Sequence, residues 1–185
     1  MQSGNDTPSP SAASGPVESP TTAADGASTR YVLLERPDWQ LQEAVDYRAG
    51  LGSFGQAEPD LDWYAEYVGP RTDHDDRSFT VPTARVSGHT AGLEALRTRL
   101  VGFEFGSDDL GGRRALVAEA ADRGPGVVLV ELEADYSVMV LSYDDVVDLR
   151  DLADGVVPVD EQQWMEAGGQ LVDCVPSEPG CAPRG

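Results

Sequence analysis

"GVVLVELEADYSVMVLSY", residues 126–143, decides the fold class, because two apolar, β-branched segments lie on either side of a tight connection at Asp135. Val128, Val130 and Leu132 alternate onto one face of the first segment, whereas its opposite face changes from apolar to acidic side chains. One continuously apolar face and one partly acidic face are typical of an antiparallel sheet with a core on one side. We therefore expect the two segments to form a β-hairpin.

Other strands are expected in the sequence before this hairpin, one directly before it and others further upstream. Residues 111–120 precede it and are separated from it by "DRGPG", so they add a third strand to an antiparallel meander. Further upstream, strands are expected in two pieces around Pro37, at residues 61–69 and at residues 83–88. The intervening residues 69–83 show no periodicity and are expected to be irregular.

Two helices are expected where apolar residues recur at helical spacing. In residues 90–100, Leu93, Leu96 and Leu100 share one face of a helix. Residues 144–156 show a second amphipathic pattern, and Asp144 and Asp145 suit the positive N-terminal end of such a helix.

A shorter helical turn is expected in residues 159–169. Asp160 and Gln163 have the spacing of a capping box, and Gly168 is placed to end the turn. The order of these elements, with long antiparallel runs, predicts an α+β fold. We expect an antiparallel, curved β-sheet with about two amphipathic helices packed on it.

The chain divides into three parts by composition. Residues 1–29 form a Ser/Thr/Pro/Ala-rich segment with too little apolar surface to fold, and we expect a disordered tether. Residues 30–170 are expected to form a single α+β domain, and residues 171–185 a C-terminal tail with a disulfide between Cys174 and Cys181.

The disulfide is inferred from the number and the spacing of the cysteines. Two cysteines are too few for a structural zinc site, and a separation of this length is not that of a C-x-x-C redox motif. A disulfide implies an oxidising, extracytoplasmic compartment. Free thiols are the alternative.

The composition excludes several classes of function. The net charge is −20, from 33 acidic residues and 13 cations that are all arginine. Binding to nucleic acids or to anionic lipids requires clustered cations, so neither partner is expected. The absence of lysine excludes P-loop, protein kinase and pyridoxal phosphate mechanisms, and we expect no cofactor. We interpret the acidity as serving solubility; a basic partner or diffuse cation binding are the functional alternatives.

The N-terminal stretch "MQSGNDTPSPSAASGP" contains no apolar h-region, so we expect neither a signal peptide nor a membrane span in it. It resembles the polar leash that follows the lipidated cysteine of bacterial lipoproteins, with Met1 in the place of that cysteine. This resemblance implies an extracytoplasmic protein, anchored to the cell envelope or secreted. The membrane would be reached only through an N-terminal lipid anchor absent from this chain. A cytoplasmic protein with a disordered head is the alternative.

"RTDHDDRSF", residues 71–79, is the candidate metal centre, because Asp73, Asp75 and Asp76 crowd His74. Read as a calcium loop from its first aspartate, the stretch lacks both the central glycine and the final glutamate. We interpret it as a solvated, mobile loop and expect no metal.

Two further motifs are set aside. Gly50, Gly52 and Gly55 satisfy G-x-G-x-x-G, but a proline and several acids follow where a phosphate-binding helix is required, so we expect a loop. Ser87 and His89 could be imagined as a nucleophile and its base, yet proximity in sequence does not show that the side chains meet. We interpret this stretch as the entry to a helix and expect no catalytic residue.

The run from residue 93 to residue 164 resembles secreted or membrane-tethered actinobacterial domains, and its ending is similar to that of extracytoplasmic sensor domains joined to anti-sigma factors. The positions of the resemblance are Leu152, Ala153, Pro158, Val159 and Trp164. The resemblance implies an extracytoplasmic binding or sensing domain and brings no catalytic residues with it.

These observations favour a non-enzymatic, lipoprotein-like cell-surface module that binds or senses an unknown protein or small hydrophobic ligand. The alternatives are a carrier with an apolar cavity under the sheet and a hydrolase that uses Asp and His. An empty volume among the inward-facing residues would favour the carrier. Convergence of His74 or His89 with carboxylates in a cleft would favour the enzyme.

Overall fold

The computed structural model describes residues 30–47, 60–75, 78–119, 124–144, 147–174 and 181. The predicted tether and the G-x-G-x-x-G motif lie outside these residues. The main sheet consists of β2 (Gln40–Tyr47), β3 (Leu61–Val68), β6 (Thr83–His89), β7 (Gly106–Leu110), β8 (Arg113–Ala118), β9 (Gly126–Glu133), β10 (Tyr136–Ser142) and β12 (Gln170–Val172).

These strands form one eight-stranded sheet in the order β12-β2-β3-β6-β10-β9-β8-β7. All neighbouring strands are antiparallel except β12 and β2, which are parallel. Two smaller pairs complete the β-structure, namely β1 (Tyr31–Leu34) with β11 (Val156–Val159), and β4 (Thr72–Asp75) with β5 (Ser78–Thr80).

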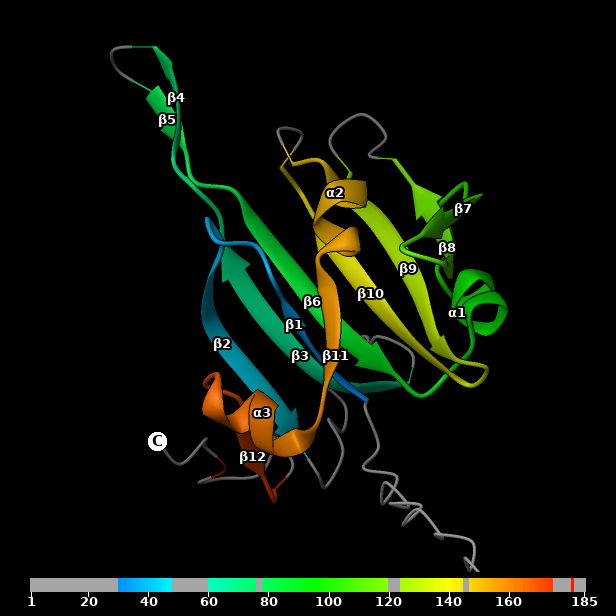
Figure 1. Cartoon of the computed structure of the whole chain (residues 1–185). Coiled ribbons are helices and arrows are strands. Elements are labelled where there is room, and N and C mark those ends of the chain that lie inside the picture. Colours follow the sequence, from blue (N-terminus) through cyan, green and yellow to red (C-terminus); the bar gives the residue numbers. More distant parts are fainter. Residues whose placement is uncertain are drawn as a thin grey trace, which may run out of the picture.

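Three helices accompany the strands in the described part of the chain: α1 (Leu93–Arg99), α2 (Leu149–Asp154) and α3 (Glu161–Glu166). The β1–β11 pair crosses one face of the sheet, with α2 and α3 at the two ends of β11 (Figure 1). Helix α1 packs on the opposite face, where Leu93 and Leu96 are buried with Leu129 and Met139. Each face of the sheet therefore has its own apolar core.

Three aromatic rings from distant parts of the sequence form the centre of the larger core. Tyr31 of β1 stacks on Trp164 of α3 with ring centroids 4.7 Å apart. Trp63 of β3 lies 6.1 Å from Tyr31 and 6.0 Å from Trp164. All three side chains are essentially inaccessible to solvent, so this cluster joins the β1–β11 pair and α3 to the sheet.

Two glycines make room for these rings. A Cβ atom on Gly88 would lie 2.2 Å from Trp63 Nε1 and 2.3 Å from the Tyr136 hydroxyl. A Cβ atom on Gly169 would lie 2.2 Å from Trp164 Cε3. All three distances are far below van der Waals contact, so only glycine is compatible with the packing at these positions.

The sequence-based predictions agree with much of this architecture. The expected strands at residues 111–120, 126–134 and 136–143 are present, and so is the mixture of an antiparallel sheet with a few helices. The capping box of Asp160 and Gln163 is also present, at the start of α3. The expected curvature of the sheet stays a prediction.

The prediction of one helix through residues 144–156 was wrong. Helix α2 begins only after Asp148, whose carboxylate accepts hydrogen bonds from the backbone N–H groups of Arg150 and Asp151. Asp144 instead accepts a hydrogen bond from the Thr83 backbone N–H at 2.8 Å. Val156, expected on the helix, begins strand β11. A capping side chain close to the helical residues therefore sets a later start than the apolar pattern suggested.

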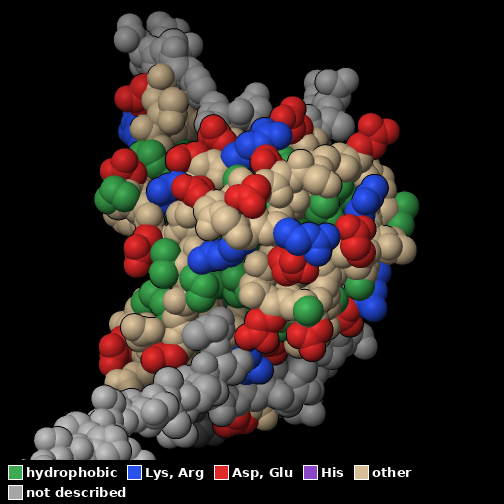
Figure 2. Space-filling view, turned by 45° about the vertical axis from the view of Figure 1, so that its right-hand side comes forward, with side chains coloured by type: hydrophobic (Ala, Val, Ile, Leu, Met, Phe, Trp, Pro, Cys, Tyr) green, Lys and Arg blue, Asp and Glu red, His purple; other side chains and the backbone are tan. Residues whose placement is uncertain are grey.

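The irregular segment expected at residues 69–83 was also predicted wrongly. Strands β4 and β5 form an antiparallel hairpin, hereafter the arm, which projects from the body of the protein (Figures 1 and 2). At the other end of the chain, the predicted domain boundary at residue 170 falls within β12, an edge strand of the main sheet. Cys174 follows this strand and forms the predicted disulfide with Cys181.

We expect Gly88→Ala to lower the free energy of unfolding by about 2 kcal/mol or more, because the new methyl group overlaps Trp63 and Tyr136. Gly106→Ala is the matched control, since it also lies in a strand but its Cβ atom would be 3.9 Å from the nearest atom. The control should change the free energy by less than about 0.5 kcal/mol. Urea unfolding of both variants tests the prediction, and equal effects would contradict it.

Candidate functional site

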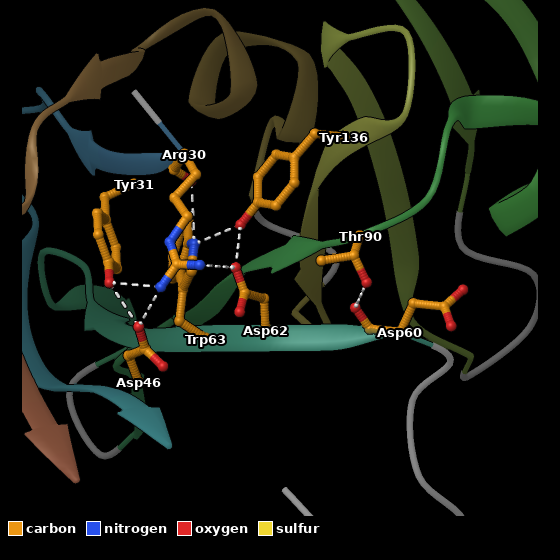
Figure 3. A network of polar contacts seen from close by, with 8 residues as sticks. All are labelled: Arg30, Tyr31, Asp46, Asp60, Asp62, Trp63, Thr90 and Tyr136. Carbon is orange, nitrogen blue, oxygen red and sulfur yellow. Dashed lines mark hydrogen bonds and ion pairs between the residues drawn. The ribbon is translucent and has the colours of Figure 1, made fainter. Parts of the chain in front are cut away.

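A network of polar contacts lies where Arg30, the residue before β1, meets the sheet (Figure 3). Arg30 Nη2 donates a hydrogen bond of 2.9 Å to Asp46 Oδ2, and Arg30 Nη1 lies 3.5 Å from Asp62 Oδ2. The Tyr31 hydroxyl donates a hydrogen bond of 2.5 Å to the same oxygen of Asp46. Asp46 is 1% exposed, so its charge depends on these donors in place of water.

The second half of the network connects Asp62 to the aromatic cluster. The Tyr136 hydroxyl donates to Asp62 Oδ2 at 2.9 Å and accepts from Trp63 Nε1 at 2.8 Å. Trp63 Nε1 also lies 3.0 Å from the Arg30 carbonyl oxygen, to which it donates. The contacts thus run from Arg30 through β1, β2 and β3 to β10. We refer to these six residues as the Arg30 network: Arg30, Tyr31, Asp46, Asp62, Trp63 and Tyr136.

The electrostatics of the Arg30 network favour one fixed set of protonation states. Burial and the hydrogen bond to Asp46 raise the pKa of Tyr31 to about 12. Burial and the charge of Asp62 also raise the pKa of Tyr136. Burial opposes the charge of Arg30, but its bond to Tyr31 and the carboxylates of Asp62 and Asp46 raise its pKa overall. The arrangement is therefore that of a structural clamp, with each charge matched by a partner.

Ser87 and His89, set aside in the sequence, are brought together in the structure. Both lie on β6 two residues apart, on the same face, and Ser87 Oγ is 2.9 Å from His89 Nε2. Ser137 of β10 pairs with His89 in register, and its hydroxyl has no hydrogen-bond partner among the described residues. The side chains are 0–1% exposed, so a substrate has no access to the hydroxyl groups.

The candidate metal site at residues 71–79 falls on the arm. Asp73 is exposed and forms an ion pair of 2.7 Å with Arg71. Of His74 and Asp75 the structure describes only the backbone, and Asp76 lies outside the described residues. The predicted loop is therefore a hairpin whose one described acidic side chain already has a cationic partner. Across the described ranges, His, Cys, Asp and Glu side chains form no group of three that could hold a metal ion.

The arm presents apolar side chains to solvent. Phe79 of β5 is 54% exposed, and Val81, which follows it, is 40% exposed. The Arg71 guanidinium lies over the Phe79 ring, 4.0 Å from its centroid. Tyr143, which follows β10, is 71% exposed. Hydrophobic side chains are visible below the arm in Figure 2.

Tyr143 is held beside the base of the arm. The Ser142 hydroxyl donates to the Thr83 carbonyl oxygen at 2.7 Å, and Asp144 accepts from the Thr83 backbone N–H. A hollow of about 310 Å³ opens here, and its lining includes Val68, Thr83, Leu141 and Tyr143. We call Phe79, Val81, Tyr143 and this hollow the arm surface. Sequence reasoning missed it, although "FTVP" at residues 79–82 contains two of its apolar residues.

We expect Tyr31→Phe to lower the free energy of unfolding at neutral pH by about 1–3 kcal/mol, because Asp46 loses a buried donor. The pKa of Tyr31 is raised on folding, so its contribution is complete below its ordinary pKa of 10.0 and is lost as the pH rises through about 12. The fall in stability above pH 10 should therefore be shallower in the variant. Urea unfolding at a series of pH values measures both effects.

Tyr143→Phe is the control for this experiment, because Tyr143 is exposed and has no part in the Arg30 network. It should leave the free energy of unfolding at neutral pH unchanged. If the two variants behave alike, the clamp does not contribute to stability as we describe.

Comparison of the chain with protein-family models, with curated proteins and with solved structures gave no match.

Proposed function

We propose that this protein is a non-enzymatic, extracytoplasmic binding module that docks a partner protein through the arm surface. The observation that carries the proposal is the exposure of large apolar side chains at the arm, namely Phe79 and Val81, and of Tyr143 at the hollow near its base. Exposed apolar clusters of this kind mark sites of interaction on otherwise soluble proteins.

The composition of the arm surface supports a protein as the partner. Phe, Tyr and Arg are the side chains that most often dominate the energy of protein interfaces. Here Arg71 covers Phe79, while Glu66 and Arg85 lie at the hollow and supply a polar rim. Within the described residues, β4 and β5 pair only with each other, so their outer edges can accept a strand from a partner.

The charge of the chain argues that the partner is a different protein. Two copies that each carry a net charge of −20 repel one another. A partner with a neutral or positive surface would be attracted instead, and charge complementarity of this sort mainly speeds association. The likeness to sensor domains of anti-sigma factors is in keeping with a docking role.

The location rests on separate observations. The disulfide between Cys174 and Cys181 favours an oxidising compartment. The lipoprotein-like composition of residues 1–29 favours attachment to the cell envelope. In the described part of the chain, the helices are too short and too polar to cross a membrane.

The two alternative functions receive less support. A carrier requires an apolar cavity, but the space under the β1–β11 pair contains the Tyr31, Trp63 and Trp164 rings. A hydrolase requires an accessible nucleophile, but the hydroxyl of Ser87 is buried with His89. The polar residues that lie closest to a catalytic arrangement are thus withdrawn from solvent.

The docking proposal can be tested by site-specific photo-crosslinking in cells that produce the protein. A photoreactive residue at Val81 should yield one crosslinked partner protein. The same residue at Met165, which is 41% exposed on α3 at the other end of the molecule, should not (Figure 1).

The purified partner then permits a quantitative test. Tyr143→Ser and Phe79→Ser should each weaken the binding of the partner at least about tenfold in calorimetry, because each removes an anchor residue of the interface. Met165→Ser should change the affinity less than about twofold. Equal crosslinking at both positions, or crosslinks only between copies of the chain, would refute the proposal.

The proposed location predicts that the cysteine-containing C-terminal peptides of protein from its native compartment stay linked until a reductant is added. Mass spectrometry of the unreduced protein provides the measurement. Free thiols in such protein would contradict an oxidising compartment.

A further inference from the structure

Two hollows lie beside helix α2, and one of them shares Ser142 with the hollow of the arm surface. One, of about 510 Å³, is lined by the ends of β8 and β10 and the start of α2. The other, of about 800 Å³, is lined by residues 101–104, by the end of β8 and by the residues before β9. Val117, Glu119 and Arg150 line both, so the two hollows are parts of one groove, which we call the Arg150 groove.

Arg150 crosses the Arg150 groove from α2 to the strands opposite. Its Nε atom donates to Asp108 Oδ2 on β7 at 3.0 Å, and its Nη1 atom donates to Glu119 Oε1 after β8 at 3.0 Å. All three side chains retain substantial exposure, at 49% for Arg150, 35% for Asp108 and 78% for Glu119. Ion pairs this exposed contribute little to stability and exchange readily with other charges.

The charge of the groove is strongly unbalanced. Among the described residues, one guanidinium faces five carboxylates, which belong to Glu104, Asp108, Glu119, Asp144 and Asp148. Asp144 and Asp148 are occupied by backbone N–H groups, and Asp108 and Glu119 share Arg150. The described residues of the groove therefore carry a net negative charge even with Arg150 in place.

The walls between these carboxylates are apolar. Val101 is 89% exposed at one end of the groove, beside the half-buried Phe103. Val147 and Leu149 line the other end, and both are half-buried. A ligand that fits this surface has both cationic and aliphatic groups.

We propose that the Arg150 groove binds a basic, amphipathic segment of another protein, in extended form. Its cationic side chains would pair with Glu104 and compete with Arg150 for Asp108 and Glu119, while its aliphatic side chains cover Val101 and Leu149. This site adjoins the arm surface at Ser142, but it does not rest on the function proposed for that surface.

The two ends of the chain do not supply a basic segment. Residues 1–29 contain no lysine or arginine, and residues 175–185 contain one arginine, Arg184. A second copy is disfavoured by the net charge of −20 on each chain. Charge complementarity thus selects a foreign basic segment.

The test must separate the groove from general attraction to an acidic protein. The probe is a fluorescently labelled peptide of alternating lysine and leucine, compared with peptides of alternating lysine and glycine and of alternating glutamate and leucine. At about 0.15 M salt, where long-range attraction is screened, the lysine–leucine peptide should bind at least about tenfold more tightly than the lysine–glycine peptide. The glutamate–leucine peptide should not bind.

Two pairs of variants locate the binding. Val101→Ser and Glu104→Gln alter exposed groove residues and touch neither core. Each should weaken the binding of the lysine–leucine peptide at least about fivefold. Met165→Ser and Glu43→Gln make the same changes at exposed sites elsewhere and should alter the affinity less than about twofold. Equal binding of both lysine peptides, or equal losses in groove and control variants, would overturn the proposal.

Discussion

The packing of Tyr31, Trp63 and Trp164 is the interaction on which the rest of the structure depends. The rings come from β1, β3 and α3, so their contact is what attaches the β1–β11 pair and α3 to the main sheet. The cluster requires glycine at residues 88 and 169, and two of its rings also contribute polar atoms to the Arg30 network. Apolar packing and buried hydrogen bonds are therefore combined in the same side chains, which fixes one arrangement rather than several.

The two surfaces that we propose as binding sites lie outside this centre. The arm extends beyond the sheet, and the Arg150 groove lies among the ends of β8, β9 and β10. Substitutions such as Tyr143→Ser or Val101→Ser touch neither core, so binding can be altered without altering the fold. Such separation of a rigid centre from adaptable edges is common where strands carry loops and arms at their ends.

Local patterns predicted local structure well. Alternation in residues 126–143 identified β9 and β10, and a side-chain spacing of three identified the capping box of α3. Sequence reasoning missed β7 and β12, because neither "GSDDL" nor "QLV" has an alternating pattern and both are defined by the strand beside them. It also predicted no structure for the arm, whose pairing depends on the partner strand rather than on periodicity.

The candidate sites were harder to predict, because their members are distant in sequence. Direct contacts within the Arg30 network join residues up to 74 positions apart, as in the contact of Asp62 with Tyr136. Extending the predicted strand of residues 83–88 by one position would have placed Ser87 and His89 on the same face of the sheet. It would not have predicted that both side chains are buried. The Arg150 groove is a property of three strand ends and one helix together, for which no single segment carries a signal.

The attachment through the N-terminal segment that we propose would give the position of Arg30 a mechanical consequence. Tension along that segment would reach the folded domain at Arg30, before it reaches the hydrogen bonds between β1 and β11. The guanidinium contacts Asp46 on β2 and Asp62 on β3, so the load is divided between two adjacent strands of the main sheet. Resistance to pulling would then depend on an ionic contact at the point of attachment as well as on the hydrogen bonds between β1 and β11.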